Sequence, residues 1–287
     1  MKKAVKKKKK KSMLPVIILL IIGISVMGYP FFSDFYNQIQ YRNINTEFDK
    51  GAKKLSREEV DKRIKLAEYY NDSLLNPNIT DPFTKNNHEK GIKEYARMLQ
   101  IKESMGYVEI PTIHQSIPIY AGTNDDILQI GAGHMEFTSL PIGGKGNHCV
   151  LTAHSGLPTK KLFTDLKKMK KGDIFFVHNI KEVLAYEVDN IQVIEPTNFE
   201  PLMKFPGRDY CTLLTCTPYM INSHRLLVRG ERTDYKEAVK KKKKSRVLLY
   251  AAIATLLLLI ILFAIYRRKK KKKIKASKAA EIKEESN

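Results

Sequence analysis

One cysteine in this chain lies at the end of a β-type run, directly before a turn. Residues 210–215 form the run, Cys216 closes it, and Thr217 and Pro218 lead the chain out of the predicted sheet. Arg225 follows in a second β-type run. A thiol can carry an acyl group as a thioester, and a fixed guanidinium can hold the carbonyl oxygen as it becomes negative. The two side chains therefore predict acyl transfer at this turn.

The acid/base for such chemistry must come from elsewhere in the sequence. Among the seven histidines, His154 follows the β-type run 150–153, so we expect its side chain at the rim of a loop. Its position alone fits a surface histidine equally well. Arg225 and Arg229 lie four residues apart and share one strand face, and either could be an ordinary surface charge. Arg225 is favoured because it lies nearer the turn after Cys216.

The cysteines do not indicate a disulfide framework. The chain has three of them, and the odd number leaves at least one thiol unpaired. Cys211 and Cys216 lie on one predicted strand and point to opposite faces, because their separation is odd. Cys149 is interpreted as a small buried hydrophobic residue. A core position is the commoner role for Cys216 as well, but its place at the strand end favours chemistry.

The positive charge of the chain is confined to three short tracts. The formal net charge is +21, which in a soluble protein suggests nucleic-acid binding. Residues 2–11 carry eight positive charges, 240–246 carry six and 267–275 carry eight, and the tail 276–287 carries two positive and three negative charges. Residues 13–239 therefore have no net charge. Nucleic acid is therefore not an expected partner. The sequence also lacks Gly-rich phosphate loops and Cys/His clusters with metal-ligand spacing, so no cofactor or metal is expected.

Two apolar runs predict membrane-spanning helices. Residues 13–32 and 247–266 are each twenty residues long and contain no charge, which is enough for a helix to cross a bilayer. The first run lacks a small-residue cleavage site and is interpreted as an uncleaved signal anchor. The basic tracts at both ends of the chain favour the cytoplasm, which places the segment between the spans outside the cell. Residues 240–246 oppose this locally and are interpreted as a patch held against anionic headgroups.

The segment after the first span begins with helices. Residues 44–75 are rich in Glu, Lys and Leu with apolar positions at helical spacing, and Ser56 followed by Glu59 fits a capping box. Residues 76–83 form a link that prolines keep out of a helix. A second short helix is expected over residues 88–104.

Short β-rich runs bounded by Gly and Pro make up the next segment. We expect eight strands with few helices between them, a pattern typical of a closed β-barrel. The predicted class is therefore mainly β. The expected strands cover residues 108–110, 117–120, 149–152, 174–177, 183–188, 191–194, 212–215 and 226–228.

Several motifs between these runs, taken in their order and spacing, resemble the class C, or pilin-polymerising, sortases of Gram-positive bacteria. The resemblance covers residues 107–232. It rests on the motifs at residues 131–136, 138–144, 151–158, 162–166, 213–219 and 224–230.

This resemblance implies a sortase-type barrel with Cys216 as nucleophile, His154 as acid/base and Arg225 as the group that stabilises the oxyanion. It implies cleavage of an LPXTG-like sorting signal between Thr and Gly, and transfer of the acyl group to an amine. In class C that amine is usually a pilin lysine, so repeated transfers build a covalent pilus. The implied partners are pilins or surface proteins that carry the signal.

Class C sortases also often carry an N-terminal lid, whose Asp-Pro-aromatic motif covers the cysteine. Asp81, Pro82 and Phe83 match that motif, although outside this resemblance they would be interpreted as an ordinary turn. The lid reading predicts that Asp81 pairs with Arg225 or a neighbouring cation and that Phe83 lies over Cys216. A C-terminal second membrane span is likewise typical of the class.

Two positions depart from the family pattern. Ser155 stands where an arginine is expected after the histidine, and this puts a contact at the rim of the site in question. Met220 replaces a glycine expected after the Thr-Pro-Tyr run. That replacement bears on the loop between Cys216 and Arg225.

Three other functions share parts of this pattern. A housekeeping sortase would pass the acyl group to the amine of a peptidoglycan precursor, but the lid motif and the second span argue against it. A membrane-anchored cysteine protease would use the same nucleophile and base and release a free acid. A noncatalytic adhesin or scaffold would keep the barrel and tolerate the loss of Cys216.

The predicted organisation has an extracellular catalytic domain and two cytoplasmic termini. Its segments are a basic N-terminus (1–12), a signal anchor (13–32), a helical region (33–104) with a lid (76–86), the catalytic barrel (105–235), a basic linker (236–246), a second span (247–266) and a basic tail (267–287).

Overall fold

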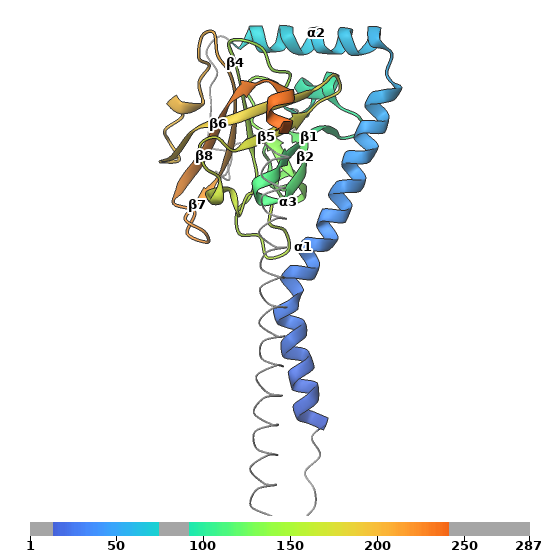
Figure 1. The fold of residues 1–287 in the computed structure, drawn as a ribbon, viewed down its shortest axis with the longest axis vertical. Coiled ribbons are helices and arrows are strands. Elements are labelled where there is room, and N and C mark those ends of the chain that lie inside the picture. Colours follow the sequence, from blue (N-terminus) through green and yellow to red (C-terminus); the bar gives the residue numbers. More distant parts are fainter. Residues whose placement is uncertain (1–13, 75–91, 241–287) are drawn as a thin grey trace, which may run out of the picture. The chain divides into compact units, whose positions relative to one another are not determined.

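Eight strands close into a barrel in the order β1-β2-β3-β4-β7-β8-β6-β5 (Figure 1). The computed structural model describes residues 14–74 and 92–240. The described residues up to Tyr235 belong to one compact unit, and residues 236–240 belong to a second. The prediction of a mainly β, closed barrel is confirmed. The strands are β1 (Ser104–Ile110), β2 (Gln115–Ala121), β3 (Ala132–His134), β4 (Asn147–Thr152), β5 (Ile174–His178), β6 (Val183–Ile194), β7 (Asp209–Thr217) and β8 (His224–Thr233).

The expected and observed strands differ in two places. The expected strands 183–188 and 191–194 are one continuous strand, β6, whose register on β8 shifts between Val188 and Asn190. A bulge of this kind bends a strand without ending it. The sequence does not predict β3, because its three residues, Ala132–His134, include no β-branched side chain.

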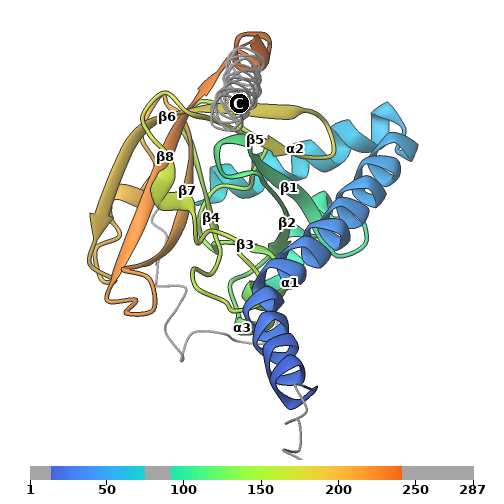
Figure 2. The same ribbon diagram turned by 60° about the horizontal axis from the view of Figure 1, so that its bottom comes forward.

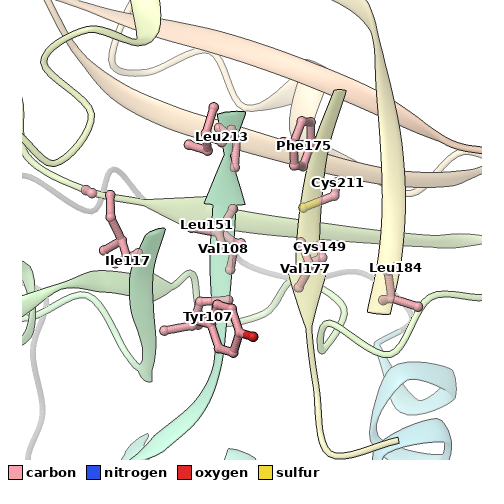
Figure 3. Packing of buried hydrophobic residues seen from close by; sticks show 14 of the residues in the cluster. Tyr107, Val108, Ile117, Cys149, Leu151, Phe175, Val177, Leu184, Cys211 and Leu213 are labelled. Atoms are coloured by element: carbon pink, nitrogen blue, oxygen red, sulfur yellow. The ribbon is translucent and has the colours of Figure 1, made fainter. Parts of the chain in front are cut away.

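Strand β7, in which Cys216 is the residue before the last, is buried on both of its faces. Figure 3 shows Cys211 and Leu213 of β7 in the barrel interior, packed with Cys149 and Leu151 of β4. Alternate residues of the same strands, Val150 and Leu214 among them, belong to a second apolar cluster on the opposite face. Packing on both faces holds this strand firmly. Cys149 is a buried core residue, as predicted.

None of the three cysteines, all of which lie within the described residues, forms a disulfide. Cys149 and Cys211 are register partners on the parallel strands β4 and β7. Cys211 packs in the interior cluster. Cys216 lies five positions along the same strand, so it faces the other way, as predicted.

Two helices precede the barrel, α1 (Leu14–Lys54) and α2 (Arg57–Ser73). The oxygen of Ser56 accepts a hydrogen bond of 3.1 Å from the backbone N–H of Glu59, so the predicted helix start at this point is confirmed. The sequence separates an anchor at 13–32 from a helix that begins at residue 44. In the structure both belong to α1, which continues through Pro30, a residue that membrane helices tolerate.

Helix α1 passes alongside β1 and β2 of the barrel (Figure 1). Its N-terminal part is apolar and exposed, with Leu19 73% and Met27 78% exposed. Within the described part of the chain, α1 is the one helix long and apolar enough to cross a membrane. The second predicted span, 247–266, lies outside the described residues, as do the basic tracts 2–11 and 267–275.

The second helix expected before the barrel, at 88–104, ends earlier than predicted, and residues 88–91 lie outside the described residues. A 3-10 helix, η1, spans Ile92–Leu99, and Ser104 already belongs to β1. Lys102 adopts a positive φ of 58°, and Ile101 forms a bridge with Ser104. This turn ends the helical segment. Further short helices are η2 (Pro111–Ile113), α3 (Asp125–Ile130), η3 (Leu166–Lys168) and η4 (Glu200–Leu202).

Candidate active site

Cys216 and Arg225 face each other across two antiparallel strands. β7 and β8 pair so that Cys216 is the register partner of Arg225. Residues directly opposite in such a pair point to the same face, with Cβ atoms about 4.5–5.5 Å apart. Both side chains are largely buried, each 7% exposed. The sheet therefore places the predicted nucleophile and the predicted cation next to each other.

The parallel pairing of β4 with β7 brings His154 to the same place. Figure 2 shows β4, β7 and β8 in the same part of the barrel. The ladder ends at Thr152 and Leu214, and the N–H of Ala153 still donates to the carbonyl of Leu214 at 3.2 Å. Continuing the same register by two positions from Thr152 and Leu214 leads to His154 and Cys216. The pairing of β4 with β7 thus brings His154 to the level of Cys216.

Two hydroxyl groups continue this ladder beyond the backbone pairing. Oγ1 of Thr215 donates to the carbonyl of Ala153 at 2.7 Å. Oγ of Ser155 donates to the carbonyl of Cys216, also at 2.7 Å. His154 lies between Ala153 and Ser155, so both of its chain neighbours are tied to the strand of the nucleophile. The contact made by Ser155 explains what this residue does at a position where the family pattern has arginine.

Two backbone carbonyls at the turn between β7 and β8 fix the guanidinium of Arg225. Its Nη1 donates to the carbonyl of Asn222 at 2.9 Å and to the carbonyl of His224 at 3.0 Å. An arginine side chain keeps its charge at all working pH values. The turn therefore presents a fixed positive charge on the face that carries Cys216.

His154 is half-buried, and its surroundings act on its charge in two opposing ways. Burial lowers the pKa of the His154 imidazole, and the carboxylate of Asp125 partly offsets this by favouring the imidazolium. Asp125 begins helix α3, which Asn124 caps by accepting from the N–H of Ile127 at 3.0 Å. No sequence pattern links Asp125 to the candidate site. An Asn followed by two acidic residues marks a helix start, but nothing in it indicates a neighbouring histidine.

A small pocket opens beside the nucleophile. Its walls come from the end of β7, the start of β8 and the loop after β4. The lining residues are Ser155, Phe163, Thr164, Lys167, Thr215, Cys216, Thr217, Tyr219 and Leu226. The pocket is small, with a volume of about 20 Å³, which is room for a water-sized group next to the thiol.

The turn between β7 and β8 explains why glycine is expected at the position of Met220. The N–H groups of Ile221 and Asn222 both donate to the carbonyl of Pro218, at 3.1 and 2.9 Å. Met220 adopts a φ of 67° and is 71% exposed. A positive φ of this size favours glycine, which is the residue the family pattern leads one to expect. Methionine keeps the turn but holds a conformation that is unfavourable for an L-residue.

Arg229, the other candidate cation, has a structural role. Its Nη2 contacts Oδ2 of Asp189 at 2.6 Å, and its guanidinium lies 4.2 Å from the ring centre of Tyr210. Asp189 is the bulge residue of β6. Arg229 therefore joins β8 to the bulge, and Arg225 is the arginine at the candidate site.

Two buried histidines are likewise engaged in the structure. Nδ1 of His134 contacts the hydroxyl of Tyr95 at 2.7 Å, and its Nε2 contacts the carbonyl of Ser139 at 2.9 Å. Nδ1 of His148 contacts the carbonyl of Met203 at 2.8 Å. Both rings are buried, whereas both chain neighbours of His154, Ala153 and Ser155, are bonded to the strand of Cys216. The lid residues Asp81, Pro82 and Phe83 lie outside the described residues.

Comparison with known proteins gives one consistent result. Residues 108–233 match the family model of the sortase domain. The crystal structure of sortase C-1 from Streptococcus pneumoniae is 59% identical, with a TM-score of 0.66, and the match covers 67% of this chain and 99% of that one. A pilus-related sortase C of Group B Streptococcus is 55% identical, with a TM-score of 0.64, over 67% of this chain and 98% of that one.

Curated sortase A proteins are more distant. The match to sortase A of Bacillus anthracis is 28% identical over 46% of this chain and 61% of that protein. For sortase A of Streptococcus agalactiae it is 31% identical over 39% and 47%. The chain thus matches about half of the length of these curated relatives. The chain belongs to the sortase family, and its similarity to solved sortase C structures supports class C.

Proposed function

We propose that this protein is a cysteine transpeptidase that joins pilin subunits covalently. The observation that carries the proposal is the convergence of three strand ends, which bring Cys216, Arg225 and His154 to one place. The similarity to pilus-related sortase C proteins supports the choice of pilins.

The first half of the reaction forms a thioester. Sγ of Cys216 attacks the threonine carbonyl of an LPXTG-like signal, and Arg225 stabilises the oxygen as it becomes negative. The Thr–Gly C–N bond then breaks, and the departing glycine amine takes a proton from the His154 imidazolium. A thiol has an ordinary pKa near ~8.5. A nearby imidazolium and guanidinium raise its thiolate fraction.

The second half transfers the acyl group to an amine. A lysine amine of the next pilin attacks the thioester, His154 takes the proton that the amine loses, and the C–S bond breaks to release Cys216. The products are an isopeptide bond and the starting enzyme. Water is the competing nucleophile, so hydrolysis in the absence of an amine should be slow in a site shaped by partner proteins.

The proposal includes the membrane topology. The exposed apolar part of α1 is consistent with an N-terminal anchor. Residues 247–266 supply a second span, both termini lie in the cytoplasm, and the barrel lies outside. It also includes a lid in which Asp81 pairs with Arg225 or a neighbouring cation and Phe83 covers Cys216.

The deciding experiment is incubation of the full-length protein with an LPXTG peptide and a lysine-containing pilin. The proposal predicts a mass increase at Cys216 from the acyl-enzyme and an isopeptide-linked product. Release of free acid alone, with no incorporation of the amine, would support a cysteine protease instead. Transfer only to a peptidoglycan-precursor amine would support a housekeeping sortase. Surface pili that persist in Cys216→Ala would support a noncatalytic role.

A further inference from the structure

The loop that carries His154 is fastened to helix α1. This loop runs from the end of β4 to η3, and the carbonyl of Thr159 at its tip accepts two hydrogen bonds from α1. Oγ of Ser33 donates at 3.0 Å and Nδ2 of Asn37 at 2.9 Å. Nδ2 of Asn37 also donates to the carbonyl of Ser33 at 2.8 Å, which fixes the amide in place.

A charged contact lies beside this pair of hydrogen bonds. The backbone N–H of Lys161 donates to Oδ1 of Asp34 at 3.4 Å, and Nζ of Lys161 lies 3.4 Å from Oδ2 of the same carboxylate. The side chain of Asp34 is only 17% exposed. Ion pairs that are partly shielded from water are stronger than fully exposed ones. Helix α1 thus contacts the loop at both Thr159 and Lys161.

The face of α1 that makes these contacts is polar, whereas the face beside it carries exposed aromatic residues. Phe32, Phe35 and Tyr36 of the same turns are 76%, 67% and 61% exposed. The polar residues Ser33, Asp34 and Asn37 point toward the loop. These turns follow directly on the predicted span at 13–32.

The opposite end of the loop is tied to the catalytic centre. Oγ of Ser155 donates to the carbonyl of Cys216, and the N–H of Gly156 donates to Oγ1 of Thr164 at 3.0 Å. The N–H of Phe163 donates to the carbonyl of His154 at 3.1 Å. The loop is therefore closed on itself next to His154. The position of the loop at Thr159 is therefore linked to its position at His154 through a short stretch of chain and a few hydrogen bonds.

We propose that Ser33, Asp34 and Asn37 are positioning residues for the loop that carries His154, so that the anchor helix contributes to the geometry of the active site. This inference rests on the proposed function, in which His154 is the acid/base. The three residues touch no reacting atom. They act by limiting the movement of a loop whose first residue must meet Cys216 and the substrate. A displacement of about 1 Å at a reacting group can cost up to about 100-fold in rate.

The first test compares Asn37→Ala with Asn43→Ala in the full-length protein in membrane vesicles. Asn43 lies on the same helix and is exposed, so its variant removes the same amide without touching the loop. Asn37→Ala should lower kcat for transpeptidation about 10-fold, a size typical of a misplaced catalytic group, with little change in KM. Asn43→Ala should match the wild type.

A second readout follows the loop itself. Lys160 and Lys161 are trypsin sites within it. Cleavage after these residues should become several-fold faster in Asn37→Ala, while other sites and the unfolding temperature stay unchanged. This measurement does not depend on activity. It still tests the contact if the wild type shows no transpeptidation, a result that would count against the proposed function alone.

A charge exchange gives the sharpest control. Asp34→Lys and Lys161→Asp should each lower kcat, and the double variant should recover part of the loss because the ion pair is restored with its signs reversed. The inference is overturned if Asn37→Ala and Asn43→Ala behave alike in both assays. It is also overturned if Asn37→Ala lowers the unfolding temperature and speeds cleavage throughout the barrel, since that would be a general structural role.

Discussion

The hydroxyl of Ser155 donates a hydrogen bond of 2.7 Å to the backbone carbonyl of Cys216. The residue after the proposed acid/base is thus bonded directly to the proposed nucleophile. This side-chain-to-backbone contact joins the loop after β4 to the end of β7, and it does not depend on the protonation of either proposed catalytic side chain. Four expected outcomes follow from this and neighbouring features.

Ser155→Ala should reduce kcat without unfolding the barrel. It removes the bond to Cys216 and lets the two strand ends separate, so we expect a loss of about 10-fold in kcat, or about 1.4 kcal/mol in the activation free energy. Ser155→Thr keeps the hydroxyl and should retain most of the activity. Steady-state transpeptidation kinetics check both variants.

Ser73→Ala is the matched control for Ser155. Oγ of Ser73 donates to the carbonyl of Tyr70, also at 2.7 Å, at the end of α2. If Ser73→Ala lowers kcat as much as Ser155→Ala does, the effect is not specific to the loop that carries His154.

Arg225→Lys and Arg229→Lys should affect different properties. Arg225→Lys loses the guanidinium held by Asn222 and His224, so kcat/KM should fall by about 100-fold or more, as for the loss of an oxyanion donor. Arg229→Lys weakens the contacts with Asp189 and Tyr210 and should mainly lower the unfolding temperature. Kinetics and thermal unfolding of both variants separate the two roles, and equal kinetic losses would refute the assignment of Arg225.

Asp125→Asn should shift the titration of His154 to lower pH. The carboxylate of Asp125 favours the imidazolium and so works against the effect of burial, which lowers the pKa of His154. Removing the negative charge leaves the lowering effect of burial unopposed, and the midpoint falls further. NMR titration of the His154 ring in a Cys216→Ala background measures this shift directly. Asp126→Asn, one residue further along α3, is the control and should move the midpoint less.

Met220→Gly should stabilise the protein. An L-residue in the left-handed region costs roughly 1–2 kcal/mol, which glycine avoids, although glycine loses more chain entropy on folding. We expect a rise of a few degrees in the unfolding temperature of the full chain. Met203→Gly is the comparison, because Met203 has a φ of −68°. There the same substitution should destabilise, and a stabilisation at both positions would contradict the explanation from φ.

Much of the fold could be predicted from the sequence, because strand patterns and helix caps are local. The capping of α2 by Ser56 and the closed, mainly β barrel are examples. The continuity of α1 between the expected span at 13–32 and the helix expected from residue 44 was not predicted, because a helix in a folded protein depends on its packing as well as on its local pattern. Strand β3 could not be predicted from its own composition. It forms a strand because it pairs with β2 and β4.

The candidate site shows the same division. The strand-end positions of Cys216 and His154 can be read from the sequence, but the parallel pairing of β4 with β7 that joins them is a long-range contact. The contribution of Asp125 and the hydrogen bond of Ser155 depend on the same pairing. From the sequence, Ser155 can be recognised only as a departure from the family pattern, in which arginine is expected at this position. The roles of Asp81, Pro82 and Phe83 stay predictions.

The unbroken course of α1 has a consequence for how substrates arrive. Asn37 lies five residues beyond residue 32, the last residue of the predicted span, which at 1.5 Å per residue is about 8 Å along the helix axis. The tip of the catalytic loop is bonded at that height. Under the proposed topology, this contact places the loop that carries His154 within roughly a headgroup layer of the lipid surface, where the proposed substrate chains would still be held at the bilayer.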